Sequence, residues 1–477
     1  MHIHWFRKDL RLSDNPALLD ACKGGQAIAI FVLDESGHHR RLGGASRWWL
    51  HFSLSKLAED LRKINVSFIL KRGNAAEIIP SIAARTKAAA VTANRRYEKS
   101  HRKEETIIAQ LLNKNGQELK LLNGNLLHDP LTHRNNQGKP YQVYTPFWRS
   151  LAAQGDPAKP AMAPKKLSAP PDIDLSSDEL KDWKLLPTKP DWAKIIAKTW
   201  NPGEESAIDS LDHFLKNNLN GYKENRNYPG KTGTSRLSPH LHWGEISPRQ
   251  IWHRTMAHCH ANGQNHFSGD AEVFLKEVCW REFSYHLLTH WPDMPTKPLR
   301  AQFEKFPWKD NGKLLRDWQL GQTGYPIVDA GMRELWQTGW MHNRVRMIAA
   351  SFLIKHLLIN WEHGETWFWD TLVDADAANN AASWQWVAGC GADAAPYFRI
   401  FNPVLQGEKF DADGNYVRQY VPELSKLPNE YIHKPWAAPP LLLAESGVVL
   451  GKTYPHPMVD HDKARKAALA ALAELKE

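Results

Sequence analysis

Residues 1–130 alternate between short apolar segments and longer segments with helical periodicity. This alternation predicts a parallel sheet covered by helices on both faces, because each parallel crossover needs a connection long enough to hold a helix. The predicted strands are His2–Phe6, Ala27–Leu33, Val66–Lys71, Ala88–Ala93 and Leu119–Leu122, and the clearest helices between them are Ser46–Asn65 and Glu98–Asn115. The N-terminal part is therefore predicted to be an α/β domain with a five-stranded parallel, Rossmann-like sheet.

The rest of the chain changes character twice. Residues 131–200 are rich in proline, lysine, alanine and aspartate, which predicts a surface linker with a few short helices. Beyond Pro202 apolar residues recur at helical spacing, most clearly in Ala271–His290, Gly324–Gly339, Trp340–Asn360, Gly364–Leu372 and Asp460–Lys476. The predicted organisation is an α/β domain (1–130), a linker (131–200) and a large all-α domain (201–477).

Composition narrows the class of protein. No apolar run approaches the length of a membrane span, and Met1–Phe6 is typical of a strand rather than a signal peptide. The four cysteines lack metal-ligand spacing, which fits a reducing compartment. We therefore expect a cytoplasmic protein, monomeric and without membrane contact.

Charge and aromatic content suggest a partner only weakly. Lysine and arginine exceed aspartate and glutamate by 61 to 52, giving a net charge of +9, which suits contact with a nucleic-acid backbone but also fits any basic protein. Tryptophans (21) outnumber tyrosines (12), so an oxidisable, stackable side chain is used unusually often. The loop after the first strand, Phe6–Arg11, has no glycine fingerprint and argues against a standard dinucleotide site there.

Two predicted helices carry polar faces that are unsuited to a core. In the first, Glu277, Trp280, Arg281 and Ser284 fall at i, i+3, i+4 and i+7. Such a face is either a salt-bridged solvent face or a cleft wall where an aromatic ring stacks on a base. In the second helix, Asn343, Arg346, Met347 and Ala350 share a face.

An arginine on such a face needs a partner, because an unpaired buried charge is costly. Asp374 and Asp376 are the candidates. An Asp-x-Asp pair can equally cap a helix or bind a metal, but the following residues, 377–380, add no histidine or carboxylate, which disfavours a metal. A third element, Gly233–Pro239, predicts either a phosphate-binding loop or an ordinary helix N-cap.

Several long motifs occur in order along the chain: Trp5–Leu12 with Asp14–Pro16, Thr234–Ser238, Thr323–Ala330, Trp340–Met347, and Trp384–Trp386 followed by Tyr397–Pro403. Together they resemble the photolyase/cryptochrome family from end to end. The resemblance implies FAD in the helical domain, with Asn343 facing the flavin N5, Arg346 paired with Asp374 beside the ring and Asp376 hydrogen-bonded to it. The remaining implied cofactor residues are Tyr222, Thr234, Ser235, Arg236, Leu237, Ser238, Arg281, Ala375 and Asn380.

The resemblance also implies a substrate, double-stranded DNA with a cyclobutane pyrimidine dimer that leaves the stack to reach the flavin. By the same resemblance Glu277 hydrogen-bonds the dimer and Trp280 and Trp386 stack on it. Ser284 and Met347 line the lesion site, and Arg226 and Arg344 contact flanking phosphates. Trp384, Trp361 and Trp308 match the family's electron relay to the flavin. With Glu277 and Asn343, these tryptophans form the expected catalytic set.

Three alternative functions stay open. A cryptochrome-type photoreceptor is disfavoured by Asn343, because plant receptors tend to carry aspartate there, and by the absence of a long tail after the helical domain. Repair of (6-4) photoproducts is disfavoured because those enzymes use histidines where this chain has Asn343 and Met347. The third alternative is a flavoprotein that binds DNA without repairing it.

The antenna chromophore is the least defined expectation. Folate-binding relatives have an Asn-Glu pair after Tyr-Glu, whereas here Tyr97-Glu98 leads to Ser100-His101, and Thr296 stands where those relatives have a lysine (Lys297 is adjacent). The segments Leu241–Glu245 and Ala388–Asp393 resemble a subgroup closer to plant cryptochromes. We expect 5,10-methenyltetrahydrofolate held in a different way, with another antenna as the alternative.

Overall fold

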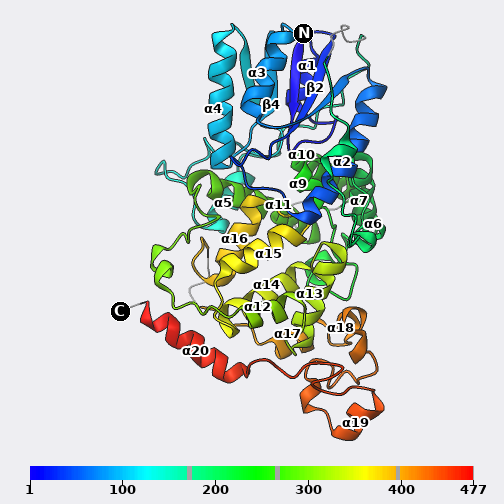
Figure 1. The fold of residues 1–477 in the computed structure, drawn as a ribbon, viewed down its shortest axis with the longest axis vertical. Helices are drawn as coiled ribbons and strands as arrows, with labels where there is room; N and C mark the ends of the chain where they lie inside the picture. The colour runs from blue at the N-terminus through cyan, green and yellow to red at the C-terminus, as the bar shows by residue number, and fades with distance from the viewer. Residues whose placement is uncertain (169–174, 264–268, 394–397, 476–477) are drawn as a thin grey trace. The chain divides into compact units, whose positions relative to one another are not determined.

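The structure is a computed structural model that describes residues 1–168, 175–263, 269–393 and 398–475 (Figure 1). The chain divides into two compact units. The first unit comprises Met1–Asn217 and Ser235–Pro292, and the second comprises Asn218–Thr234 and Asp293–Glu477. Helices α10 (Pro248–Ala261) and α11 (Gly269–His290), which the sequence analysis placed in the helical domain, group with the first unit.

The first unit is built on the predicted five-stranded parallel sheet, in the order β3-β2-β1-β4-β5. The strands are β1 (His2–Phe6), β2 (Ala27–Leu33), β3 (Ser67–Arg72), β4 (Ala90–Asn94) and β5 (Glu118–Leu122). The first two have the predicted bounds. β1 pairs in parallel with β2 on one side and β4 on the other, so the strand order reverses between β1 and β4. Such a reversal usually opens a ligand crevice at the carboxyl ends of the strands.

Helices connect these strands and cover them. They are α1 (Pro16–Cys22), α2 (Gly44–Lys63), α3 (Ala75–Arg85) and α4 (Lys99–Lys114). Ile79 of α3 and Ile108 of α4 pack in one core cluster with Ile3, Ile30 and Val91 of the sheet. The first unit continues through α5 (Tyr144–Ala152), a 3₁₀ turn (Leu180–Trp183), α6 (Lys194–Thr199), α7 (Glu204–Asn217), α9 (Ser238–Trp243), α10 and α11.

In the described part of the second unit, all regular secondary structure is helical, apart from one isolated bridge. Its main helices are α8 (Tyr222–Asn225), α12 (Gly312–Gln319), α13 (Pro326–Thr338), α14 (Asn343–Ser351), α15 (Trp361–Thr371), α16 (Ala377–Ala388), α17 (Pro403–Phe410), α18 (Asn415–Tyr420), α19 (Pro440–Glu445) and α20 (His461–Glu474). Short turns lie at Ala301–Lys305, Pro422–Leu424 and Pro435–Ala437. None of the helices in the described ranges is long and apolar enough to cross a membrane.

One predicted helix, Trp340–Asn360, is shorter in the structure. α14 begins at Asn343 because His342 caps it: the imidazole accepts a hydrogen bond from the Arg344 amide. Its C-terminal turn widens into a π-helix over Phe352–His356, and Leu358 then adopts a left-handed φ of 54° that ends the helix. The apolar residues on both sides of α14 are buried in the core and keep a helical spacing. Periodicity alone could therefore not show where the α-helix begins and ends.

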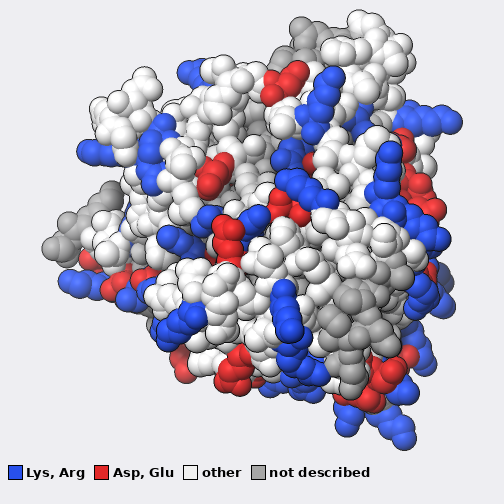
Figure 2. Space-filling view, turned by 90° about the horizontal axis from the view of Figure 1, so that it is seen from above, with Lys and Arg blue, Asp and Glu red and all other residues white. Residues whose placement is uncertain are grey.

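The charged side chains do not form a single basic field on the face in Figure 2. Lysine and arginine alternate there with aspartate and glutamate. The net charge of +9 is therefore an unreliable guide to where a polyanion would bind, and specific arginine positions carry more information.

Among the glycines that the structure describes in the first unit, Gly244, which ends α9, leaves the least room for an added Cβ. It adopts a left-handed φ of 67°, and a Cβ there would lie 2.0 Å from the carbonyl oxygen of Lys8. Backbone atoms on both sides cannot move apart cheaply, so only glycine fits.

We predict that Gly244→Ala lowers the free energy of unfolding by more than about 3 kcal/mol, since left-handed strain and a backbone clash add together. Gly116→Ala is the matched control: its φ is 70°, but no atom lies within 4 Å of the added Cβ. The control should lose only about 1–2 kcal/mol, the strain alone. Urea unfolding of both variants measures the difference, and equal losses would contradict the contact.

Candidate functional site

The predicted polar–aromatic face of α11 is present, but its members have different surroundings. Trp280 is half-buried and its ring stacks on Tyr144 of α5, with centroids 3.7 Å apart and planes 8° apart. Glu277 is half-buried, whereas Ser284 is buried and donates to the carbonyl of Trp280. Arg281 donates to the Asn125 carbonyl at 2.8 Å. The face therefore presents a carboxylate beside a pre-ordered indole, and the Ser284 hydroxyl is bonded within its own helix.

Sequence reasoning missed Tyr144, which lies in the region predicted as a linker. Its hydroxyl donates to the Lys276 carbonyl at 2.6 Å and so fixes the ring against α11. The only available signal was the aromatic segment Tyr144–Trp148, which has the spacing of a short amphipathic helix. Stacked rings of this kind hold each other at a fixed orientation, which suits an indole that must present one face to a ligand.

A buried carboxylate, Glu282, anchors the other side of α11. It accepts hydrogen bonds from the Leu127 amide and from His128, both at 2.9 Å. Around it lies a cluster of imidazoles formed by His128, His133, His286 and His290. Burial, and then the neighbouring histidines, lower the pKa of His286 to about 2. Burial likewise lowers the pKa of His133 to about 4, so both rings are neutral at pH 7.

These depressed pKa values predict acid sensitivity. Below pH 6.5 the unfolded chain protonates His286 and His133 while the folded protein does not, so the free energy of unfolding falls as pH falls. Each ring contributes at most about 1.4 kcal/mol per pH unit. Urea unfolding between pH 7 and pH 5 should show this slope.

His286→Gln is the test variant, because the Gln carbonyl can still accept the Tyr141 amide hydrogen bond that His286 accepts in the structure. It should flatten the slope, while the exposed control His363→Gln should not change it. A parent protein that gains stability on acidification would refute the prediction.

In the second unit, Arg346 has the partner that the desolvation argument demanded. Its Nη1 and Nη2 donate to the two carboxylate oxygens of Asp374 at 3.2 and 2.9 Å, and its Nε donates to the Met341 carbonyl at 2.7 Å. A bidentate pair fixes the guanidinium plane. Asn343, at the start of α14, is exposed, and Met347, one turn further on, is half-buried.

Asp376 caps helix α16. One of its carboxylate oxygens, Oδ1, accepts hydrogen bonds from the amides of Ala378 and Asn379 at 3.1 and 2.8 Å. Of the two interpretations of the Asp-x-Asp pair, the helix cap is therefore confirmed for Asp376. Asn380 is buried and donates to Glu365 Oε1 at 2.8 Å. Ala375 is buried between the two aspartates. The cap and the Asn380 contact hold the α15–α16 pair in register.

The predicted phosphate loop, Thr234–Ser238, includes a strained position. Arg236 adopts a left-handed φ of 53°, which costs about 1–2 kcal/mol in a residue other than glycine. Its guanidinium lies over Trp200, 4.4 Å from the ring centroid. Leu237 is the N-cap residue of α9, and its side chain makes no capping hydrogen bond. This loop is therefore not an ordinary side-chain N-cap. Strain of this kind concentrates at binding sites. Tyr222, in the second unit, is buried.

The three tryptophans of the predicted relay belong to the core of the second unit. Trp384 and Trp361 are buried in it, and Trp308 packs against it while partly exposed. The Trp384 ring has Phe368 at 4.9 Å and Trp318 at 6.3 Å as neighbours. The exposure of Trp308 is what the surface end of a relay requires.

Arginines gather near the start of α14. Arg344 lies over Phe410, 4.4 Å from its centroid, and donates to Asn227. Burial, together with the charges of Arg226 and Arg399, lowers the pKa of Arg344. Sequence reasoning identified Arg226 and Arg344 but missed Arg399, although it lies in the motif 397–403, of which Tyr397 is outside the described residues. Trp386, half-buried, donates to the Asp393 carbonyl.

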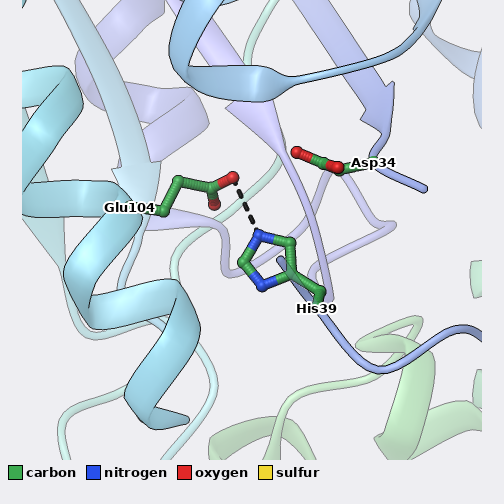
Figure 3. A group of neighbouring side chains, drawn as sticks. All are labelled: Asp34, His39 and Glu104. Atoms are coloured by element: carbon green, nitrogen blue, oxygen red, sulfur yellow. Dashed lines mark hydrogen bonds and ion pairs between the residues drawn. The ribbon is translucent and has the colours of Figure 1, made fainter. Parts of the chain in front are cut away.

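Potential metal ligands occur elsewhere. Among the residues that the structure describes, one group qualifies by mutual distance: Asp34, His39 and Glu104 of the first unit (Figure 3). It lies apart in sequence from Asp374 and Asp376, for which a metal was disfavoured.

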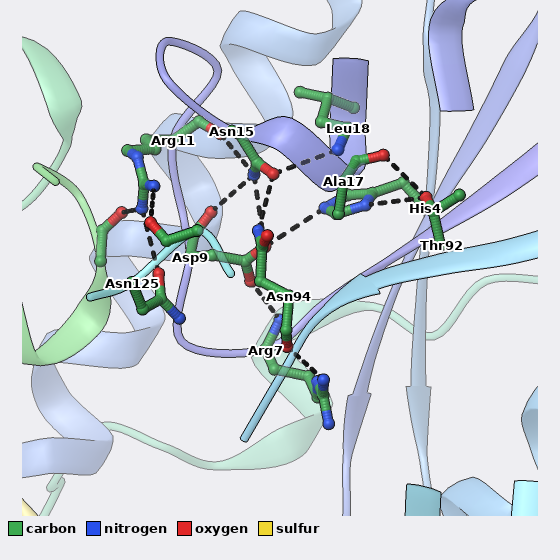
Figure 4. Close-up of polar contacts among 12 residues, drawn as sticks. His4, Arg7, Asp9, Arg11, Asn15, Ala17, Leu18, Thr92, Asn94 and Asn125 are labelled. Atoms are coloured by element: carbon green, nitrogen blue, oxygen red, sulfur yellow. Dashed lines mark hydrogen bonds and ion pairs between the residues drawn. The ribbon is translucent and has the colours of Figure 1, made fainter. Parts of the chain in front are cut away.

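The N-terminal motif is occupied by contacts of its own unit (Figure 4). Asp9 Oδ2 accepts from the side-chain amide of Asn94 at 2.6 Å, and the same amide donates to Asn15 Oδ1 at 2.7 Å. Burial acts to raise the pKa of Asp9, but His4, the Arg7 amide and Asn94 outweigh it and lower that pKa to about 2. Arg7 pairs with Glu105 at 2.7 Å. These contacts tie the loop after β1 to β4, α1 and α4 of the same unit.

Comparison with known proteins gives consistent matches over the whole chain. Residues 2–165 match the family model of DNA photolyase, and residues 274–474 match the FAD binding domain of DNA photolyase. The deoxyribodipyrimidine photo-lyase of Agrobacterium fabrum is 53% identical, over 100% of this chain and 98% of the relative. Cryptochrome-1 of Arabidopsis thaliana is 37% identical, over 99% of this chain and 70% of the relative.

Solved structures agree. The crystal structure of a bacterial class III photolyase from Agrobacterium tumefaciens superposes with a TM-score of 0.96 at 53% identity, covering 100% of this chain and 97% of that one. An archaeal photolyase from Sulfolobus tokodaii with two FAD molecules gives a TM-score of 0.82 at 26% identity and covers 99% of both chains.

Proposed function

Because the chain belongs to the DNA photolyase family, we propose that it repairs cyclobutane pyrimidine dimers in DNA by a light-driven reaction with FAD as its cofactor. The main observation behind the proposal concerns one face of α14. Asn343 is exposed there, and Arg346, one turn further on, forms two hydrogen bonds with the Asp374 carboxylate. The 53% identity with a deoxyribodipyrimidine photo-lyase over the whole chain supports the choice of reaction.

The residues fit a flavin dinucleotide. A fixed guanidinium–carboxylate pair suits a planar, hydrogen-bonding ring system, and the strained Arg236 loop without a side-chain cap suits phosphates. By the family resemblance, Arg346, Asp374, Asp376 and Asn343 would hold the ring, and Arg281, Ala375 and Asn380 are its further expected cofactor residues. Tyr222 and Thr234–Ser238 would hold the phosphates. Bound FAD supplies a one-electron donor that light can excite.

The lesion would be held by side chains that bind it without transferring a proton to it. Glu277 offers a half-buried carboxylate to the dimer bases, and Trp280, ordered by Tyr144, offers a stacking surface. Ser284 supports that helix turn, and Met347 and Trp386 supply apolar contact. Arg226, Arg344 and Arg399 gather positive charge for the flanking phosphates. A dimer stacks poorly, which lowers the cost of extruding it from the duplex.

We further propose that Trp384, Trp361 and Trp308 pass electrons from the surface to oxidised flavin. Trp384→Phe keeps an aromatic side chain in the core but replaces the oxidisable indole by a smaller phenyl ring that is hard to oxidise. We expect this variant to lose photoreduction of oxidised flavin, followed by the flavin absorbance under illumination with an external reductant.

Repair by Trp384→Phe protein that has been reduced chemically beforehand should persist, since the relay is then not needed. Trp318→Phe is the matched control, because Trp318 is a buried neighbour of Trp384 outside the proposed relay. Normal photoreduction in Trp384→Phe would refute the assignment of Trp384.

One assay separates the candidate functions. Chemically reduced protein is illuminated with duplex DNA that carries either a cyclobutane dimer or a (6-4) photoproduct, and restoration of the bases is followed by chromatography. We expect restoration of the cyclobutane dimer alone. Repair of the (6-4) lesion, or binding without repair, would favour a different photolyase or a photoreceptor and would overturn the proposal.

The antenna, the assembly and the location are proposals of the same kind. We propose 5,10-methenyltetrahydrofolate as the antenna; the archaeal relative with two FAD molecules makes a second flavin the competing chromophore. The absorption spectrum of chromophores released from purified protein distinguishes the two. We also propose that the protein acts on DNA as a monomer in the cytoplasm.

A further inference from the structure

Three potential metal ligands from two segments, the loop after β2 and helix α4, meet beside the carboxyl ends of the sheet strands in the first unit (Figure 3). Asp34 directly follows β2, His39 lies further along the same loop, and Glu104 is on α4. The His39 Nε2 atom is 2.9 Å from Glu104 Oε1, and one ligand atom from each residue lies within 4.8 Å of the others. No residue of this group belongs to the proposed flavin or DNA sites.

The imidazole of His39 is held in one orientation by two contacts with α4. Its Nδ1 lies 2.9 Å from the Ser100 hydroxyl, and its ring stacks on His101 with centroids 4.0 Å apart and planes 13° apart. Histidines that bind metals typically use their second nitrogen in such an outer contact, which orients the first. The fold therefore already aims Nε2 at the Glu104 carboxylate.

The donor set selects the class of ion. One imidazole nitrogen with two carboxylate oxygens matches the three-ligand zinc sites that keep a fourth position for water. Ca²⁺ and Mg²⁺ prefer oxygen ligands alone. Metal–ligand bonds of 2.0–2.2 Å place tetrahedral ligands about 3.3–3.6 Å apart, a separation that small side-chain movements can reach from the observed positions.

The electrostatics favour a cation. The side chains of His39 and Glu104 are only 7% and 8% exposed, so the carboxylate is poorly solvated. Nearby arginines engage other carboxylates: Arg7 pairs with Glu105, and Arg72 pairs with Glu35. Asp34 accepts hydrogen bonds from the Ala75 and Ser36 amides, which position it without neutralising it.

We propose that Asp34, His39 and Glu104 bind one zinc ion, which ties the loop after β2 to helix α4. The ion joins two segments of the first unit at the sheet edge and keeps its fourth position for water. The proposal does not depend on the repair activity.

The test uses untagged, full-length protein with its flavin, freed of metal by a chelator and dialysis, and titrated with zinc chloride in a calorimeter. We expect one equivalent to bind and the thermal midpoint to rise. Cobalt should bind in its place with the visible absorption of a tetrahedral ion. His39→Ala should weaken zinc binding at least 100-fold, and Ser100→Ala, which removes the outer contact, about 10-fold.

His38→Ala is the matched control, because His38 is the exposed neighbour of His39 on the same loop. It should bind zinc like the parent. Circular dichroism and flavin content verify that each variant is folded, and Glu104→Gln replaces His39→Ala if that variant is not. Absence of saturable binding in the parent, or equal loss in the His38 and His39 variants, would overturn the proposal.

Discussion

The first unit depends on one fully buried guanidinium. Arg11 is 0% exposed and donates to the carbonyls of Asp14 at 2.7 Å and Gly244 at 2.9 Å, and also to Gly124. Burial lowers the pKa of Arg11, whereas Asp14 and Asp9 act to raise it. Since an unpaired buried charge costs several kcal/mol, segments far apart in sequence must meet at this side chain. Gly244 is a glycine because the α9 end has to approach the Lys8–Asp9 backbone to supply its carbonyl.

In the second unit, Asp329 is a buried charged group that likewise brings distant segments together. This buried carboxylate accepts from the Thr323 and Gly324 amides at 2.7 and 3.0 Å and from the Tyr454 hydroxyl at 2.6 Å. Burial is the largest influence and raises the pKa of Asp329. The motif 323–330 therefore anchors the start of α13. At the other end of α13, Glu334 accepts from the His342 amide, which fixes the corner that leads into α14.

These constraints explain which features the sequence revealed. The sheet was predictable because buried parallel strands are continuous apolar runs, and an acidic partner for Arg346 was predictable because a desolvated charge demands one. The choice of Asp374 over Asp376 came from the family resemblance. Tyr144, Glu282 and Arg399 were not, since their importance comes from partners that periodicity cannot identify. The stacking of Tyr144 on Trp280 joins residues far apart in sequence, across a region whose composition indicated only a linker. The roles of the flavin and DNA residues remain predictions from family resemblance.

The surplus of tryptophan shows how packing and chemistry can share a residue. Trp384 fits against Gly364 so closely that a Cβ on Gly364 would lie 2.1 Å from the indole. Glycine on α15 thus lets the indole of α16 enter the core, where Phe368 and Trp318 hold it at fixed angles. The proposed relay requires its indoles at fixed positions, and core packing fixes the position of Trp384. A tryptophan in this position needs no specialised site, because the close packing that stabilises the helices is also what keeps a redox-active ring in place.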